Sequence, residues 1–228
     1  MMHHKSFIAN AKLMLMAFVL HNPSSFVILD MLFVTLKILL VLIIAGLSIR
    51  AYLIAKDKRY LFLSVAFTMI FIALILKDLS TYFFMQNILC AGCIGYAPFF
   101  AFYYSYLAFY LVGVGTLGLI YLKTRNTIVL VTLGIMLVMA SILSVTSHIA
   151  FSGLVALLYG FVTLRSIEHY GVTKNKLTLF TIIAFGSITI GHFLRAIMSQ
   201  VPIFYPIGEA LTVLGYAFLV FVLMKVYS

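Results

Sequence analysis

Six ionisable side chains stand inside or at the edge of long apolar stretches, and their chemistry is that of charge binding. They are Asp30, Lys77, Asp78, His192, Arg195 and Glu209. An ionised group is costly in hydrocarbon, so such groups are rare in membrane segments and usually face a bundle interior or a water-filled cavity. Here they either form a pairing network that fixes helix register or bind an anionic or polar ligand. The sequence leaves both interpretations open.

The spacing of these groups predicts which of them act together. His192 and Arg195 are three residues apart, so they share one face of a helix. Lys77 and Asp78 are neighbours, about 100° apart around a helix axis, so one points into the bundle and the other elsewhere. A buried cation needs a carboxylate partner. We therefore expect Arg195 or Lys77 to pair with one of the three carboxylates named above.

Two histidines offer a cofactor chemistry as an alternative. His148 and His192 lie near the same ends of neighbouring apolar stretches. Two facing neutral imidazoles can hold a haem iron axially, whereas a lone buried histidine is more often a hydrogen-bonded polar residue. A zinc hydrolase needs about three protein ligands and an open position, and no HxxxH or HExxH pair occurs. No metal ligand set is predicted, and the cofactor is unknown apart from the haem alternative.

The cysteines Cys90 and Cys93 form a CxxC pair in "LCAGCIGYAP". This pair resembles the outer-face CxxC of membrane thiol oxidases of the DsbB and vitamin K epoxide reductase type, which implies disulfide exchange. The chain lacks the second cysteine pair that such enzymes use to pass electrons onward. A disulfide that tightens a loop, or two unpaired thiols, is the other interpretation.

The composition decides the solvent of the fold. Of 228 residues, 65% are hydrophobic and only 9% charged, with mean hydropathy +1.22. A soluble domain carries about 25% charged residues, so this chain lacks the charge to cover a water-facing surface. Lipid offers no hydrogen bonds to the backbone, and long continuous apolar runs then predict helices. No ATPase motif, kinase extension or large loop favours an enzyme.

Seven apolar runs predict an all-α polytopic membrane protein. They are 26–54, 60–84, 97–122, 127–146, 149–166, 177–199 and 203–226. Each approaches or exceeds the roughly 20 residues that span a bilayer. Within residues 1–25 the apolar part, 7–20, is too short for a further span, and we expect an interfacial segment there. Residues 26–228 form the transmembrane domain.

The basic residues predict the orientation of these spans. Lys and Arg crowd the first, third and fifth connections and position 225, whereas the other connections carry none. The positive-inside rule then places the N-terminus outside, the C-terminus in the cytoplasm and the protein in the cell membrane. The net charge of +10 is an orientation signal and not a nucleic-acid signal. Lys77 lies about 25 Å along its helix, in the outer third, and Lys37 lies deeper, about 16 Å from the outer start of the first span.

The runs on either side of 127–146 resemble each other, which predicts a parallel duplication. With Ala66 aligned on Ala184, Lys77 falls on Arg195. The following helices align so that the glycines at 113 and 215 match. We expect repeat 1 at about 26–122, a linker helix at 127–146 and repeat 2 at about 149–226.

This three-plus-one-plus-three pattern resembles the architecture of the SWEET sugar transporters and of microbial rhodopsins. The resemblance implies a ligand site at the repeat interface near mid-membrane. It does not extend to motifs, because no Pro-Gln pair occurs and Lys225, at a helix end, is wrongly placed for a retinal Schiff base. The stretch "IRAYLIAKDKRYLFLSVAF" resembles a pattern in uncharacterised archaeal multi-helix membrane proteins, which implies no activity.

Three functions remain open. The first is binding or transport of a small polar or anionic ligand through an outward-facing vestibule lined by the six residues named first. The second is an electron-transfer subunit using haem, quinone or the cysteine pair. The third is a structural subunit of a larger membrane complex. The expected partners are the lipid bilayer and either further copies of the chain or other membrane subunits, not nucleic acid.

Overall fold

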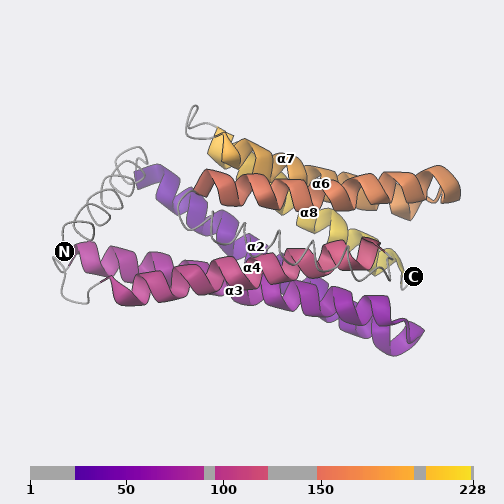
Figure 1. The fold of residues 1–228 in the computed structure, drawn as a ribbon, viewed down its shortest axis with the longest axis horizontal. Coiled ribbons are helices and arrows are strands. Elements are labelled where there is room, and N and C mark those ends of the chain that lie inside the picture. The colour runs from indigo at the N-terminus through magenta and orange to yellow at the C-terminus, as the bar shows by residue number, and fades with distance from the viewer. Residues whose placement is uncertain (1–23, 90–95, 123–147, 198–203, 227–228) are drawn as a thin grey trace.

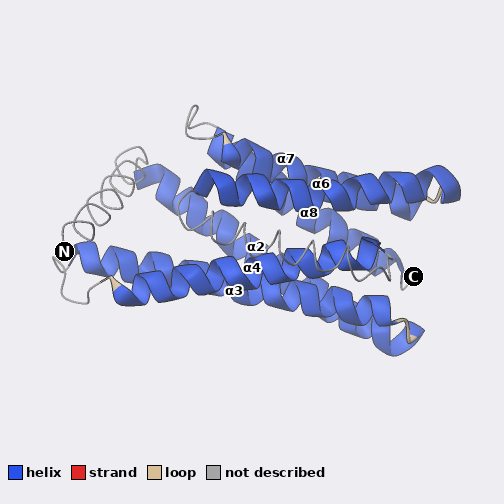
Figure 2. Ribbon diagram, viewed as in Figure 1, coloured by secondary structure: helices blue, strands red, loops and turns tan. Residues whose placement is uncertain are grey.

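The computed structural model describes residues 24–89, 96–122, 148–197 and 204–226. Within these ranges every regular element is an α-helix (Figures 1 and 2). The helices are α2 (Ser24–Ala55), α3 (Lys58–Leu89), α4 (Ala97–Leu122), α6 (His148–Thr173), α7 (Lys176–Ala196) and α8 (Phe204–Val226). The all-α prediction is confirmed for the described part of the chain.

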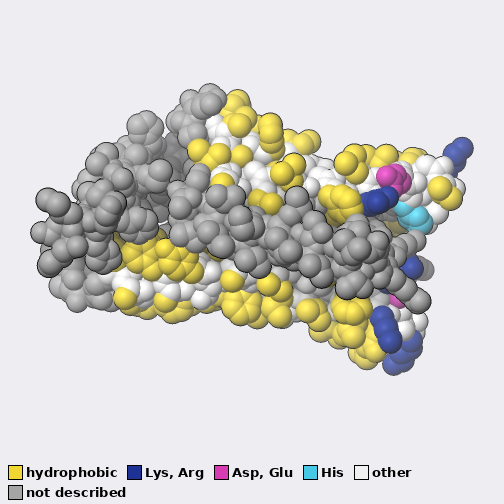
Figure 3. Space-filling model, viewed as in Figure 1, with side chains coloured by type: hydrophobic (Ala, Val, Ile, Leu, Met, Phe, Trp, Pro, Cys, Tyr) yellow, Lys and Arg dark blue, Asp and Glu magenta, His cyan; other side chains and the backbone are white. Residues whose placement is uncertain are grey.

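All six described helices are long and apolar enough to cross a membrane. Many large hydrophobic side chains on them are exposed, among them Leu53, Leu157 and Leu164. Figure 3 shows an apolar flank, with Lys and Arg gathered at the end of the bundle that holds the α2–α3 connection. Leucines facing outward along whole helices require a lipid solvent. The architecture is therefore that of a polytopic membrane protein.

Six of the seven expected spans correspond to these helices, and the fourth, 127–146, lies outside the described residues. The interfacial segment at 1–25 also lies outside them, apart from the first two residues of α2. The predicted end of the fifth span at 166 is wrong, because α6 continues to Thr173. Polar residues do not end a helix by themselves. The chain turns where Lys174 adopts a φ of 49°, and the Asn175 side chain then caps α7 by accepting the Leu177 N–H at 3.0 Å.

The helices form two triplets in chain order. In the first triplet α3 packs against α2 and α4, and in the second α7 packs against α6 and α8. The triplets meet through α2 with α8 and through α4 with α6, and no other pair of described helices from different triplets comes close. The arrangement can be followed in Figure 1, where α3 and α4 lie below α6 and α7 and α2 runs obliquely from the upper left.

Glycine permits close helix approach in each triplet. A Cβ atom at Gly113 on α4 would lie 2.8 Å from the Ala66 carbonyl oxygen of α3. A Cβ atom at Gly215 on α8 would lie 2.6 Å from the Ala184 carbonyl oxygen of α7. Small residues allow such backbone contact where no hydrophobic effect drives helices together. The two triplets thus use the same kind of contact between their second and third helices.

Candidate functional site

Three buried charged side chains from three helices form an ion triad. Lys37 on α2 donates through Nζ to Oε2 of Glu209 on α8. Arg195 on α7 places Nη1 3.2 Å from the other oxygen, Oε1, of Glu209. The side chains are 3%, 4% and 0% exposed for Lys37, Arg195 and Glu209. A buried charge needs a partner of opposite sign, and Glu209 serves both cations.

Close contact between α7 and α8 brings the arginine and the carboxylate together. A Cβ atom at Gly208 would lie 2.6 Å from the Gly191 carbonyl oxygen and 3.1 Å from Cγ of Arg195. Any larger residue at Gly208 would push the helices apart at the level of Glu209. The glycines next to the charged residues therefore set the geometry of the triad.

Further charges surround the triad. Lys77 is half-buried and interacts electrostatically with both Lys37 and Glu209. Asp78 is exposed and interacts with Lys77 and Asp30. Three cations and three carboxylates thus gather at one end of the bundle, and we call them the ion cluster: Lys37, Lys77, Arg195, Asp30, Asp78 and Glu209.

A second polar contact, besides that of Lys37 with Glu209, joins α2 and α8. The Tyr205 hydroxyl at the start of α8 donates to Oδ1 of Asp30 on α2. Tyr205 also interacts electrostatically with Glu209 and Arg195. The α2–α8 contact, which joins the two triplets, is therefore polar at two successive levels.

Buried tyrosines and a histidine continue the polar interior beyond the ion cluster. The Tyr110 hydroxyl lies 3.0 Å from Nε2 of His192 and 3.4 Å from the Tyr216 hydroxyl. The Tyr216 hydroxyl is also 3.4 Å from that of Tyr159, whose ring stacks on the imidazole with centroids 5.8 Å apart. These four side chains come from α4, α6, α7 and α8, and we call them the tyrosine network. Tyr106 links the network to the cluster, because it interacts electrostatically with Arg195 and Glu209 and packs edge-on against Tyr110.

The triad has hydrogen-bonding capacity that its neighbours leave unused. Within the described part of the chain, Nε of Arg195 donates no hydrogen bond. Oε1 of Glu209 faces the guanidinium but accepts no well-directed hydrogen bond from described residues. Buried polar groups in native proteins almost always have hydrogen-bond partners. A donor and an acceptor side by side suit a small polar molecule that carries both functions.

The structure brings together some of the predicted residues and adds one. Arg195 pairs with Glu209, which is one of the pairings that the sequence predicts. No described ion pair joins Lys77 to Glu209. Lys37 was expected to lie deeper and apart. It reaches Glu209 because α2 extends beyond the start of α8, so that Asp30 stands level with Tyr205 and Lys37 with Glu209. A cation in the middle of an apolar run was the signal for this residue.

Other predicted residues fall outside the described side chains. Cys90 and Cys93 lie in 90–95, and His148 begins α6 without a described side chain. The haem pair therefore stays a prediction. His192 is buried, and the bond of its Nε2 atom to Tyr110 is the hydrogen-bonded state expected as the alternative to iron ligation.

Comparison of the chain with protein-family models, with curated proteins and with solved structures gives no match. The functional argument therefore rests on the geometry of the ion cluster and the tyrosine network.

Proposed function

We propose that this chain is a multi-pass protein of the cell membrane that binds a small polar or anionic ligand at the ion cluster and carries it across the bundle. The observation that carries the proposal is the buried triad, in which two cations, Lys37 and Arg195, share one carboxylate, Glu209. Burial of ion pairs is weak evidence for stability, since well-packed hydrophobic residues are often as stable or more stable in the same place. A binding role explains the three buried charges better than a stabilising role does.

The donors indicate the class of ligand. A guanidinium presents several N–H groups in a planar fork that matches carboxylates and phosphates. Arg195 has its Nη1 atom on Glu209 and its Nε atom without a hydrogen bond to described residues. A small carboxylate at this face of the guanidinium would meet a donor at Nε. The nearby Lys77 would compensate its charge.

Matching contacts in the two triplets favour the parallel duplication and a site between its halves. Cβ atoms at Gly113 and Gly215 would each meet a carbonyl oxygen and an isoleucine Cγ1 atom, that of Ile70 in one triplet and Ile188 in the other. These partners are the residues that the sequence alignment places at equivalent positions. Transporters built from repeats bind their ligands at the repeat interface. The ion cluster joins the two triplets, as this proposal requires.

The basic connections support the orientation that we propose. The Lys and Arg residues at 56–59 lie at the start of α3, whereas Lys77 lies in its second half. Under the positive-inside rule the ion cluster then belongs to the outer half of the bundle. A ligand would enter from outside, past Asp30 and Asp78.

Thermal unfolding of the detergent-purified protein tests the proposal. A panel of small carboxylates, sulfate and phosphate is compared with chloride at equal ionic strength. We expect one class to raise the melting temperature of the wild type, because a ligand that binds only the folded state stabilises it. The shift should disappear in Arg195→Gln and persist in Lys225→Gln, which removes an exposed cation at the other end of α8.

Two results would contradict this function. One is the absence of any stabilising compound for the wild type, and the other is an equal shift in both variants. The electron-transfer alternative depends on residues 90, 93 and 148, whose side chains are not described, and it stays a hypothesis.

A further inference from the structure

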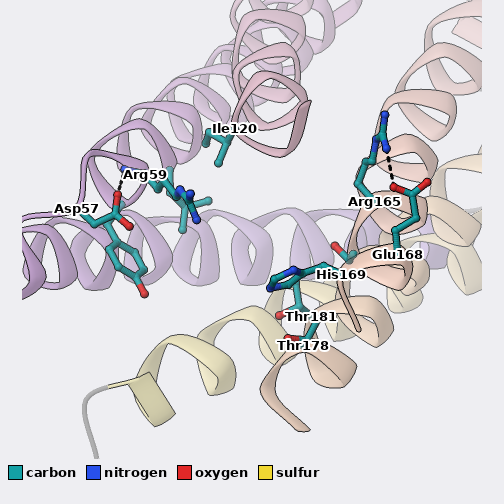
Figure 4. Close-up of a pocket in the computed structure, with 11 residues that line it drawn as sticks. Asp57, Arg59, Ile120, Arg165, Glu168, His169, Thr178 and Thr181 are labelled. Carbon is teal, nitrogen blue, oxygen red and sulfur yellow. Dashed lines mark hydrogen bonds and ion pairs between the residues drawn. The ribbon is translucent and has the colours of Figure 1, made fainter. Parts of the chain in front are cut away.

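A second polar site lies at the other end of the bundle. A cavity of about 500 Å³ opens between the two triplets, close to the connections α2–α3 and α6–α7 (Figure 4). It is lined by Asp57, Arg59, Tyr60, Leu63, Ile120, Arg165, Ser166, Glu168, His169, Thr178 and Thr181. Its volume is in the range of small-molecule sites. None of its lining residues belongs to the ion cluster.

Cationic side chains from both triplets and hydroxyl side chains from α7 line this cavity. Arg59 extends toward it from α3, and His169 approaches from α6 on the opposite side (Figure 4). Arg165 comes from the same helix as His169, and the hydroxyls of Thr178 and Thr181 come from α7. Arginine forks with hydroxyl donors are the usual ligands of phosphate oxygens in proteins.

The two carboxylates in the lining already have partners. Asp57 accepts the backbone N–H of Arg59 at 2.9 Å, next to the start of α3. Glu168 pairs with Arg165 at 2.5 Å, but the two side chains are 63% and 42% exposed. An exposed pair contributes little and exchanges readily with another anion. The guanidinium of Arg165 is thus available to an incoming phosphate, and that of Arg59 has no carboxylate partner among the described ion pairs.

The remaining wall of the cavity is apolar. Leu63 on α3 and Ile120 on α4 face it, together with the Tyr60 ring. A bare inorganic anion would leave this wall and most of the volume unused. The lining therefore suits a molecule with a phosphate at one end and an apolar or glycerol-like portion at the other.

We propose that this cavity binds an amphiphilic phosphate ester, with its phosphate held by basic side chains of the lining, Arg59 and Arg165 among them, and its less polar portion against Leu63 and Ile120. Two sources share this chemistry, the headgroup of an anionic phospholipid and a soluble phosphate ester. The inference stands apart from the proposed function, since it uses a different end of the bundle and different residues.

Native mass spectrometry of the full chain in a neutral detergent tests the lipid source. The protein is titrated with phosphatidylglycerol and, separately, with phosphatidylcholine. Glycerol 3-phosphate against sodium chloride at equal ionic strength, followed by thermal unfolding, tests the soluble source. The variants are Arg59→Gln and Arg165→Gln. Lys58→Gln is the control, because Lys58 neighbours Arg59 but does not line the cavity.

We expect the wild type to bind phosphatidylglycerol or glycerol 3-phosphate, and each arginine variant to bind about tenfold more weakly, a change of about 1.4 kcal/mol. Lys58→Gln should change affinity less than twofold. Binding of the lipid alone identifies a headgroup site, and binding of the soluble ester identifies a metabolite site. Circular dichroism confirms that each variant is folded.

The proposal is overturned if neither probe binds the wild type. It is also overturned if Lys58→Gln weakens binding as much as Arg59→Gln, because the interaction would then be a general attraction to basic residues. Arg59→Gln and Arg165→Gln should keep the melting-temperature shift that the wild type shows with a small carboxylate, so the two sites are tested separately.

Discussion

The two ends of the bundle each contain an arginine–glutamate pair, and the pairs differ in their solvent. Arg195 and Glu209 are 4% and 0% exposed and lie on different helices. The Glu209 carboxylate also pairs with Lys37. Arg165 and Glu168 are 42% and 63% exposed and lie one turn apart on α6. The same chemical pair is thus a tie between helices at one end and an exchangeable surface contact at the other.

The comparison also concerns how the triplets meet. At the end with the ion cluster, α2 and α8 are joined by Lys37 with Glu209 and by Asp30 with Tyr205. At the end with the cavity, space lined by polar side chains separates α3 and α4 from α6 and α7. Buried charged side chains therefore hold the two triplets in contact at the ion cluster, whereas a cavity separates the triplets where the charged side chains are exposed.

The largest expected effect comes from removing the shared carboxylate. Glu209→Gln leaves two buried cations without a counterion, and we expect a loss of about 3–5 kcal/mol of unfolding free energy or failure to fold. Denaturant unfolding in detergent, or the fraction of monodisperse protein after purification, measures it. Glu168→Gln is the matched control at the exposed pair and should cost no more than about 1 kcal/mol. Equal losses would show that burial does not distinguish the pairs.

Helix contact at the closed end should be the next most sensitive feature. A Cβ atom at Gly191 would lie 2.6 Å from the Gly208 carbonyl oxygen, so we expect Gly191→Ala to cost about 1–3 kcal/mol through overpacking. Gly171, near the cavity end of α6, has no atom of the described residues outside its own helix turn within 4 Å of such a Cβ atom. Gly171→Ala should therefore be neutral or stabilise the helix by up to about 1 kcal/mol. Melting temperatures of the two variants measure the difference, and a matching decrease in both would contradict the contact at Gly191.

A smaller effect is expected within the tyrosine network. Tyr216→Phe removes a buried hydroxyl that lies 3.4 Å from both Tyr110 and Tyr159, and we expect a loss of about 0.5–1.5 kcal/mol. Tyr82 is exposed, and its hydroxyl accepts a hydrogen bond from Gln86, so Tyr82→Phe should change stability by less than about 0.5 kcal/mol. Chemical denaturation followed by circular dichroism compares them. A neutral Tyr216→Phe would mean that the hydroxyls do not interact.

The smallest effect concerns the exposed pair itself. A double-mutant cycle with Arg165→Gln and Glu168→Gln should give a coupling free energy of about 0.2–1 kcal/mol. This coupling should fall as salt rises from 0.05 to about 0.5 M, because exposed charges are screened. A coupling that is large and independent of salt would place the pair in a dry environment and remove the contrast with Arg195 and Glu209.

Local features of the sequence predicted the helices well and their ends less well. Long apolar runs and basic connections are properties of neighbouring residues, and six of the runs are helices. The sequence predicted the end of α6 too early, because the polar residues Glu168 and His169 indicated a loop. The helix instead continues to Thr173, and Lys174 then adopts a positive φ. The pairing of Arg195 with Glu209 was within reach because few buried carboxylates were available.

The sequence by itself determined that the solvent is lipid, that the described elements are helices and that basic residues crowd alternate connections, since each follows from hydropathy and spacing along the chain. Only the tertiary structure decided that Lys37 contacts Glu209, and that Tyr110, Tyr159 and Tyr216 converge near His192. Those contacts depend on how far each helix is shifted and rotated against its neighbours. Shift and rotation follow from packing between segments that are distant in the sequence, which no local pattern encodes.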